Sequence, residues 1–243
     1  MHTRGPMMQR TSRTTTRTRG GFTLMETALA TVIIGVGVLA IIEAQQAFLR
    51  TNSWSTHAST ATYLANEVRE MTRTFPRHDR FAGGLYFTTP GDPATLNGWG
   101  PESDETSILD FDDLDDFDGL VIGDATTLPD GFTLNTRIPG PIDAFGEVIP
   151  ETLWSGETEM IEVDGEEQMV AMRGWTQLVS VEKVDPLDYN AVVTDAAFQT
   201  DAEGDIIRDV DRYPVRVTVT ILYQGEFDQE APPITTVSWI VPP

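Results

Sequence analysis

The densest group of side chains that could do chemistry is an aspartate-rich stretch near the middle of the chain. Its carboxylates belong to Asp110, Asp112, Asp113, Asp115, Asp116 and Asp118, interleaved with Phe111, Leu114 and Phe117. Oxygen ligands at this density could hold calcium, which takes about six to eight of them. The spacing is not that of an EF-hand, because the alternating ligand pattern is broken and no glutamate lies at the twelfth position. The stretch therefore favours a solvated acidic loop, with calcium binding at these aspartates as the alternative.

Residue types that carry enzymatic chemistry are sparse elsewhere. The chain contains no cysteine, which excludes a thiolate metal site, a cysteine nucleophile and a disulfide. Of the three histidines, His2 lies near the start, while His57 and His78 have no ligand spacing, phosphate loop or nucleophile elbow around them. The sequence therefore predicts that the protein is not an enzyme and needs no cofactor apart from the calcium considered above.

A second chemically notable residue is a carboxylate inside an apolar segment near the amino terminus. Residues 22–42 are apolar apart from threonines, glycines and Glu26. At a helical rise of about 1.5 Å per residue they span roughly 30 Å, which matches one bilayer core. A charged side chain at the centre of a membrane helix costs about 2.5–3.5 kcal/mol, so Glu26 requires an explanation. One explanation is an acid that snorkels to the membrane edge.

The distribution of charge predicts how this segment is oriented. The first 21 residues hold five arginines and no acid, whereas residues 22–243 hold 11 basic and 38 acidic side chains, a net charge of −27. Because positive residues favour the cytoplasmic side, we expect the amino terminus in the cytoplasm and residues 44–243 across the membrane. So acidic a chain repels phosphate backbones, which argues against nucleic-acid binding by this chain alone.

The residues around Glu26 form a recognisable motif. Residues 20–26, with the sequence GGFTLME, follow a basic leader and open the apolar run. In this combination they resemble the class III signal of type IV prepilins and pseudopilins. The resemblance implies that a prepilin peptidase cuts between Gly21 and Phe22 and methylates the new amino group of Phe22. Glycine suits the position before the cut, because it lets a protease approach the backbone closely.

The resemblance also implies a role for the carboxylate of Glu26, which becomes the fifth residue after cleavage. It would pair with the terminal ammonium of a neighbouring subunit during assembly, and the pairing would offset the cost of burying both charges in lipid. A plain signal anchor without filament chemistry is the alternative interpretation of this segment.

Beyond the membrane segment, the sequence predicts that the helix continues. Apolar or small residues at a mostly 4,3 spacing mark one helix face: Trp54, Ala58, Ala61, Ala65, Val68 and Phe75, with Leu64 and Met71 flanking. Pro76 would stop the helix, since proline disfavours helix in the residue before it, and we expect helix as far as Thr74. The stripe is expected to pack against a sheet.

After about residue 80 the pattern changes to that of strands. The clearest strand is Tyr213 to Tyr223, where apolar residues alternate with polar ones. Val237, Trp239 and Val241 repeat the alternation, and the polar connection from 224 to 233 predicts a carboxy-terminal hairpin. Weaker strands are expected at 132–138, 159–163, 168–172 and 175–184. The predicted fold class is α+β, a long amino-terminal helix packed on an antiparallel sheet, which is similar to a pilin head.

These features suggest four parts and a function. The parts are a basic leader at 1–21, a transmembrane and assembly helix at 22–42, an amphipathic helix at 43–75, and a β-rich head with acidic loops at 76–243. Residues 64–70 (LANEVRE), together with the late valine-rich hairpin, resemble minor pilins of the pilus-modification type and the minor pseudopilin of type II secretion. The resemblance implies a structural minor subunit of a type IV pilus, with a type II secretion pseudopilin as the alternative.

The same resemblance implies partners and a location. The partners would be prepilin peptidase, other pilin or pseudopilin subunits, and the inner membrane. The protein would cross the inner (cell) membrane once, with a cytoplasmic amino terminus and a periplasmic or extracellular head, and enter a pilus or pseudopilus on assembly. The alternative to a structural filament subunit is a signal-anchored, exported domain that binds a ligand or acts as an enzyme.

Overall fold

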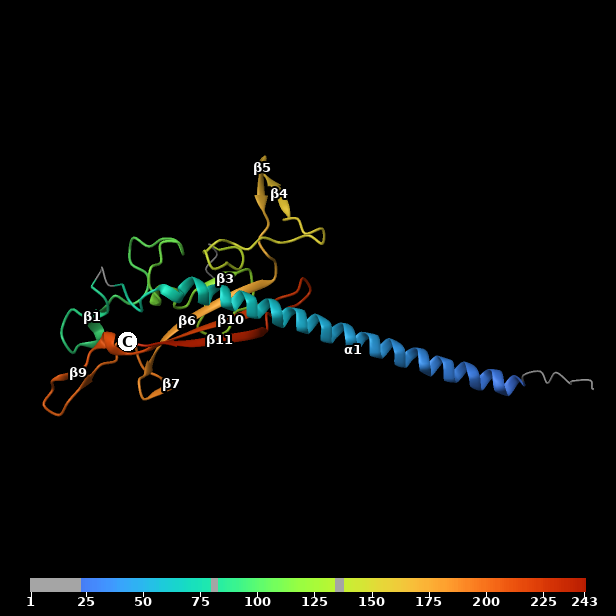
Figure 1. Cartoon of the computed structure of the whole chain (residues 1–243), viewed down its shortest axis with the longest axis horizontal. Helices are drawn as coiled ribbons and strands as arrows, with labels where there is room; N and C mark the ends of the chain where they lie inside the picture. The colour runs from blue at the N-terminus through green and yellow to red at the C-terminus, as the bar shows by residue number, and fades with distance from the viewer. Residues whose placement is uncertain (1–22, 80–82, 134–137) are drawn as a thin grey trace, which may run out of the picture. The chain divides into compact units, whose positions relative to one another are not determined.

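One long helix dominates the amino-terminal part of the computed structural model, which describes residues 23–79, 83–133 and 138–243. This helix, α1, spans Leu24–Met71 and is followed by a 3₁₀ turn at Thr72–Thr74 (Figure 1). The chain divides into two compact units, Met1–Asn52 and Ser53–Pro243, so α1 contributes to both. Helical structure ends at Thr74, just before Pro76, as the sequence predicts.

The first unit contains the apolar half of α1. Its large side chains are exposed within the chain, among them Leu29, Ile33, Val36 and Leu39. Within the described residues, α1 with its 3₁₀ turn is the one helix long and apolar enough to cross a membrane. By length and composition the segment is compatible with a single-pass anchor, and a signal sequence or the core helix of a soluble protein would meet the same criteria.

The second unit is built on a five-stranded antiparallel sheet. The strand order is β11-β10-β6-β3, and β7 (Asp188–Val192) also pairs with β6. The predicted carboxy-terminal hairpin is confirmed, because β10 (Val215–Tyr223) pairs with β11 (Pro233–Val241) and places Val217 opposite Trp239. The other edge of β10 pairs with β6 (Trp175–Asp185), which in turn pairs with the short β3 (Val121–Gly123).

Short two-stranded ribbons and 3₁₀ turns complete this unit. The ribbons are β1 (Tyr86–Phe87) with β2 (Leu96–Asn97), β4 (Met160–Val163) with β5 (Glu166–Met169), and β8 (Gln199–Thr200) with β9 (Ile206–Arg208); the turns lie at Pro93–Thr95, Asp115–Phe117 and Val210–Arg212. The strands expected at 159–163 and 168–172 correspond to β4 and β5, with β5 shifted toward the amino terminus. In the expected strand at 132–138, residues 132, 133 and 138 are not in a strand and 134–137 lie outside the described residues.

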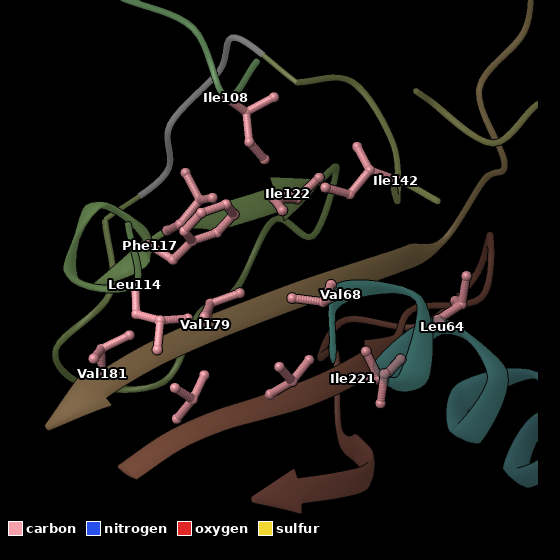
Figure 2. Packing of buried hydrophobic residues seen from close by; sticks show 14 of the residues in the cluster. Leu64, Val68, Ile108, Leu114, Phe117, Ile122, Ile142, Val179, Val181 and Ile221 are labelled. Carbon is pink, nitrogen blue, oxygen red and sulfur yellow. The ribbon is translucent and has the colours of Figure 1, made fainter. Parts of the chain in front are cut away.

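The core lies between the carboxy-terminal part of α1 and the sheet. Leu64 and Val68 of α1 are fully buried and pack in one cluster with Val179, Val181 and Ile221 of the sheet (Figure 2). On β10, inward apolar residues alternate with half-buried polar ones, which explains the two-residue period in its sequence. The α+β arrangement expected from the sequence is therefore confirmed.

The buried stripe on the helix differs from the expected one in its extent. The sequence predicts Trp54 on the packed face, but 67% of its surface is exposed. The buried helix positions are Ala61, Leu64, Ala65 and Val68. Burial thus begins at Ala61, because periodicity identifies a helix face and not how far along it the sheet extends.

Candidate functional site

The first candidate site is the start of α1, where the prepilin-like motif lies. Gly21 and Phe22, the predicted cleavage and methylation positions, lie outside the described residues, whereas Glu26 is described. The Glu26 carboxylate oxygen Oε2 accepts hydrogen bonds from the backbone N–H of Thr23 at 2.8 Å and from its hydroxyl at 3.0 Å. In return, the backbone N–H of Glu26 donates to the Thr23 hydroxyl at 3.3 Å.

These reciprocal bonds form a capping box, in which Thr23 precedes the helix and Glu26 is its third residue. The interpretation of Glu26 as a snorkelling acid or an assembly residue missed this role. A Thr-x-x-Glu pattern before an apolar run is a known sequence signature of a helix start, so the signal was present in residues 23–26. Because the carboxylate stays exposed, a cationic group of another molecule can still reach it.

The second candidate site is the aspartate-rich stretch, which belongs to a segment we call the acidic loop (residues 99–120). Leu114 and Phe117 of this loop are buried in the core, and Phe111 packs against the same cluster. The backbone N–H of Leu114 donates to the carbonyl of Pro76 at 3.0 Å. The apolar residues at a three-residue spacing therefore draw the loop onto the body of the second unit.

Burial of three of the six aspartates contradicts the interpretation of this stretch as a solvated loop. Asp113, Asp115 and Asp116 are only 1–2% exposed, while Asp110, Asp112 and Asp118 are exposed. The reason is that Leu114 and Phe117 enter the core and bring inside Asp115 and Asp116, which lie between them, and Asp113, which precedes Leu114. The exposed Asp118 is itself fixed, because its Oδ1 accepts a hydrogen bond from the backbone N–H of Val181 at 2.9 Å.

Two glutamates that the sequence interpretation did not include join the aspartates. Glu102, Asp113 and Asp116 bring carboxylate oxygens within 4.8 Å of one another, and Glu105 and Asp112 do the same with Asp116. Asp110, Asp115 and Asp118 belong to neither group. The only sequence signal for the glutamates is their three-residue spacing, and that spacing does not show that the loop folds back on itself.

Electrostatics of this cluster disfavour full ionisation. Burial, reinforced by the neighbouring Asp115 carboxyl, raises the pKa of Asp113 to about 9. Burial and the charge of Asp113 raise the pKa of Asp116 to about 8, and burial together with Glu105 raises the pKa of Glu102 to about 7. Carboxylates crowded in this way are held together by protons or by a cation. Calcium binding stays a prediction. The structure groups only three of the six predicted aspartates, Asp112, Asp113 and Asp116, and adds the two glutamates.

A buried polar cluster lies beside the acidic loop. Lys183 is fully buried on β6, and its ammonium donates to the backbone carbonyls of Asp195 and Val210. Burial lowers the pKa of Lys183 to about 7, against the opposing charges of Asp195 and Asp115. His78 Nδ1 lies 3.1 Å from Asp115 Oδ2 without hydrogen-bond geometry, and burial lowers the pKa of His78 to about 4. Among Lys183, His78 and Asp115, no nucleophile is hydrogen-bonded to a base.

Neither the family models, nor the curated proteins, nor the solved structures gave a match to this chain.

Proposed function

We propose that this protein is a structural minor subunit of a type IV pilus. In this proposal prepilin peptidase cleaves the chain between Gly21 and Phe22 and methylates Phe22, and the chain crosses the inner membrane once before assembly. The apolar part of α1 then packs with the corresponding helices of other subunits, while the second unit, Ser53–Pro243, contains the head. The motif at residues 20–26 supports the processing step, and the helix supports the assembly step.

The main structural support for the proposal is the exposed apolar surface of α1 in the first unit. Leu29, Val32, Ile33, Val36 and Leu39 are each about 60% exposed. No soluble monomer gains from exposing such a continuous apolar surface, so lipid or other helices must cover it. An anchored subunit that moves from lipid into a helical bundle satisfies this requirement in both states.

Glu26 distinguishes an assembling helix from a plain anchor. It is the only charged residue between 23 and 42. Within a single chain its carboxylate caps the helix through Thr23. After cleavage, the ammonium of Phe22 would lie one residue before Thr23, so a second subunit could present that charge to Glu26. Pairing the two charges offsets their desolvation, which gives neighbouring subunits a defined register.

The processing step is tested by mass spectrometry of the protein purified from its native membrane. We expect a chain that begins at Phe22 and carries one methyl group on its terminal amine. An intact Met1, or a cut at another position, would overturn the proposal and favour a signal-anchored exported domain.

The assembly step is tested with Glu26→Gln, which keeps the shape of the side chain and removes its charge. We expect the variant to be cleaved and membrane-bound but absent from sheared filaments. Glu43→Gln is the matched control, because Glu43 is an exposed acid on the same helix beyond the apolar run, and its filaments should form normally. Normal incorporation of the Glu26→Gln chain would refute the assembly role.

A further inference from the structure

Two overlapping groups of three carboxylates in the acidic loop each have the spacing of ligands around a cation. Glu102 and Asp113 each bring a carboxylate oxygen within 4.8 Å of Asp116, and so do Glu105 and Asp112. Calcium binds oxygen at about 2.3–2.6 Å, so two oxygens on one ion lie no more than about 5 Å apart. Both groups meet this limit, and they share Asp116.

A buried carboxylate oxygen of Asp116 also points to a ligand, independently of the spacing. Asp116 Oδ2 accepts hydrogen bonds from the backbone N–H groups of Asp112 and Asp113, both at 3.2 Å, which fixes the carboxylate in the loop. Its Oδ1 is buried and has no hydrogen-bond partner among the described residues. A buried carboxylate oxygen without a partner is costly, and such oxygens are uncommon in folded proteins. The atom therefore requires a partner that the described part of the chain does not supply.

Among the described residues, no basic side chain supplies that partner. In the described ranges 23–79, 83–133 and 138–243, none of the five carboxylates lies within 4.0 Å of a lysine, arginine or histidine nitrogen. The adjoining cavity of about 450 Å³ is lined by acidic residues, namely Asp79, Glu102, Asp104, Glu105, Asp110 and Asp112. Because several of these acids are exposed, an ion can enter from solvent.

We propose that Glu102, Glu105, Asp112, Asp113 and Asp116 bind one calcium ion. The five groups offer only oxygen ligands, which select a hard cation over zinc, copper or iron. Calcium accepts an irregular set of six to eight oxygens, about as many as these carboxylates and a few waters provide, whereas magnesium demands near-octahedral geometry and gives up water reluctantly. This site lies in the head and does not depend on the proposed filament function.

The bound ion would stabilise the packing of the acidic loop. Leu114 and Phe117 anchor the loop in the core, and the Leu114 N–H holds it to Pro76 at the end of the helical segment. The same packing forces Asp113 and Asp116 together inside the protein. An ion that neutralises them therefore favours the folded loop over any state in which it detaches from the core.

The binding test uses the full chain in detergent, freed of metal with a chelator. Isothermal titration with CaCl₂ should show one ion per chain. Thermal unfolding should shift upward by roughly 5–10 °C at a free calcium concentration about 100 times Kd, and MgCl₂ should give a clearly smaller shift. The absence of calcium binding would overturn the site, and an equal shift with magnesium would overturn its assignment to calcium.

Variants separate a specific site from general attraction to an acidic protein. Asp116→Asn should weaken calcium binding at least tenfold and, with chelator present, should unfold at or above the wild-type temperature. The amide oxygen can still accept from the backbone N–H groups of Asp112 and Asp113, and an amide needs neither a proton nor a cation to be neutral inside the protein. The matched control is Asp205→Asn in an exposed turn, which should bind calcium like the wild type. Wild-type affinity in Asp116→Asn, or an equal loss in both variants, would refute the proposal.

If Asp116→Asn does not fold, the half-buried Glu105→Gln replaces it in the same comparison. It removes one ligand of the group formed with Asp112 and Asp116 and leaves the buried backbone contacts of Asp116 intact. A tenfold loss of calcium affinity is expected for this variant, and an unchanged affinity would refute the site.

Discussion

The side-chain amide nitrogen of Gln177 on β6 donates a hydrogen bond to the backbone carbonyl of Leu64 in α1, at 3.0 Å. The same nitrogen donates to the carbonyl of Ile142 at 3.0 Å, and the amide oxygen accepts from the Ile142 N–H at 2.8 Å. All three residues are fully buried. One polar side chain therefore joins the helix, the sheet and the loop around residue 142, with every bond made inside the core.

Gln177→Met should destabilise the second unit. The substitution keeps the approximate length of the side chain but leaves the buried N–H of Ile142 without its acceptor, which costs about 1–3 kcal/mol. Urea unfolding monitored by tryptophan fluorescence measures this change in the free energy of unfolding. Gln168→Met on the exposed β5 is the control and should change it by less than about 0.5 kcal/mol. Equal stability of the two variants would show that the Gln177 bonds contribute nothing net.

Thr23→Ala should weaken the start of α1. The alanine cannot accept the hydrogen bond from the Glu26 N–H or donate to its carboxylate, and loss of such a cap costs about 0.5–2 kcal/mol. Hydrogen exchange of the full chain in detergent should show faster exchange at the first turn. Thr31→Ala is the control, because the Thr31 hydroxyl only donates to the Thr27 carbonyl within the helix. Unchanged exchange in Thr23→Ala would argue against the capping box.

Lys183→Met should remove a pH-dependent contribution to stability. The folded-state pKa of Lys183 is about 7, whereas an unfolded lysine titrates near 10.5. Between these values the unfolded chain holds a proton that the folded chain has released, so this contribution to the free energy of unfolding rises with pH. The groups that face the ammonium are Arg77, His78, Asp115, Asp195, Asp211, Trp99 and Tyr213.

The measurement compares urea unfolding of wild type and Lys183→Met at pH 7, 8 and 9, since subtraction cancels the titration of the other acidic groups. The wild type should gain stability relative to the variant by at most about 1.4 kcal/mol per pH unit. A constant difference across this range would mean that Lys183 does not titrate there. No second lysine complicates the comparison, because Lys183 is the only one in the chain.

Gly123→Ala should cost far more than Gly119→Ala. Gly123 has a φ of 138°, and an added Cβ would lie 2.5 Å from the Trp175 carbonyl oxygen. Gly119 also has a positive φ, but no atom lies within 4 Å of its added Cβ. We expect about 1 kcal/mol for Gly119→Ala from backbone strain alone and roughly 3 kcal/mol or more for Gly123→Ala. Equal losses in urea unfolding would contradict the close approach of β3 to β6.

Patterns in the sequence correctly predicted the elements whose structure is set by residues close together along the chain. Proline at position 76 ends the helical segment wherever the chain folds, because it removes a donor and restricts the preceding residue. The alternation from Val215 to Ile221 requires a half-buried strand, and a short polar connection then pairs it with the next strand. The same kind of local reasoning could have found the Thr23–Glu26 capping box.

The acidic loop shows where such reasoning fails. Six aspartates in one stretch are normally solvated, but Leu114 and Phe117 have a place in the core and bring Asp113 and Asp116 inside with them. Glu102 reaches Asp113 only because the loop folds back on itself. Contacts of this kind depend on where distant parts of the chain meet, which no periodicity encodes.

By itself, the sequence determined the apolar amino-terminal helix, its end before Pro76 and the carboxy-terminal hairpin. Each of these follows from the chemistry of residues close together along the chain. Only the tertiary structure decided that helix burial starts at Ala61, that Lys183 lies inside, and that Glu102 and Glu105 join the aspartates. Burial is set by the packing of segments far apart in the sequence, and it is burial that makes the acidic loop a candidate cation site.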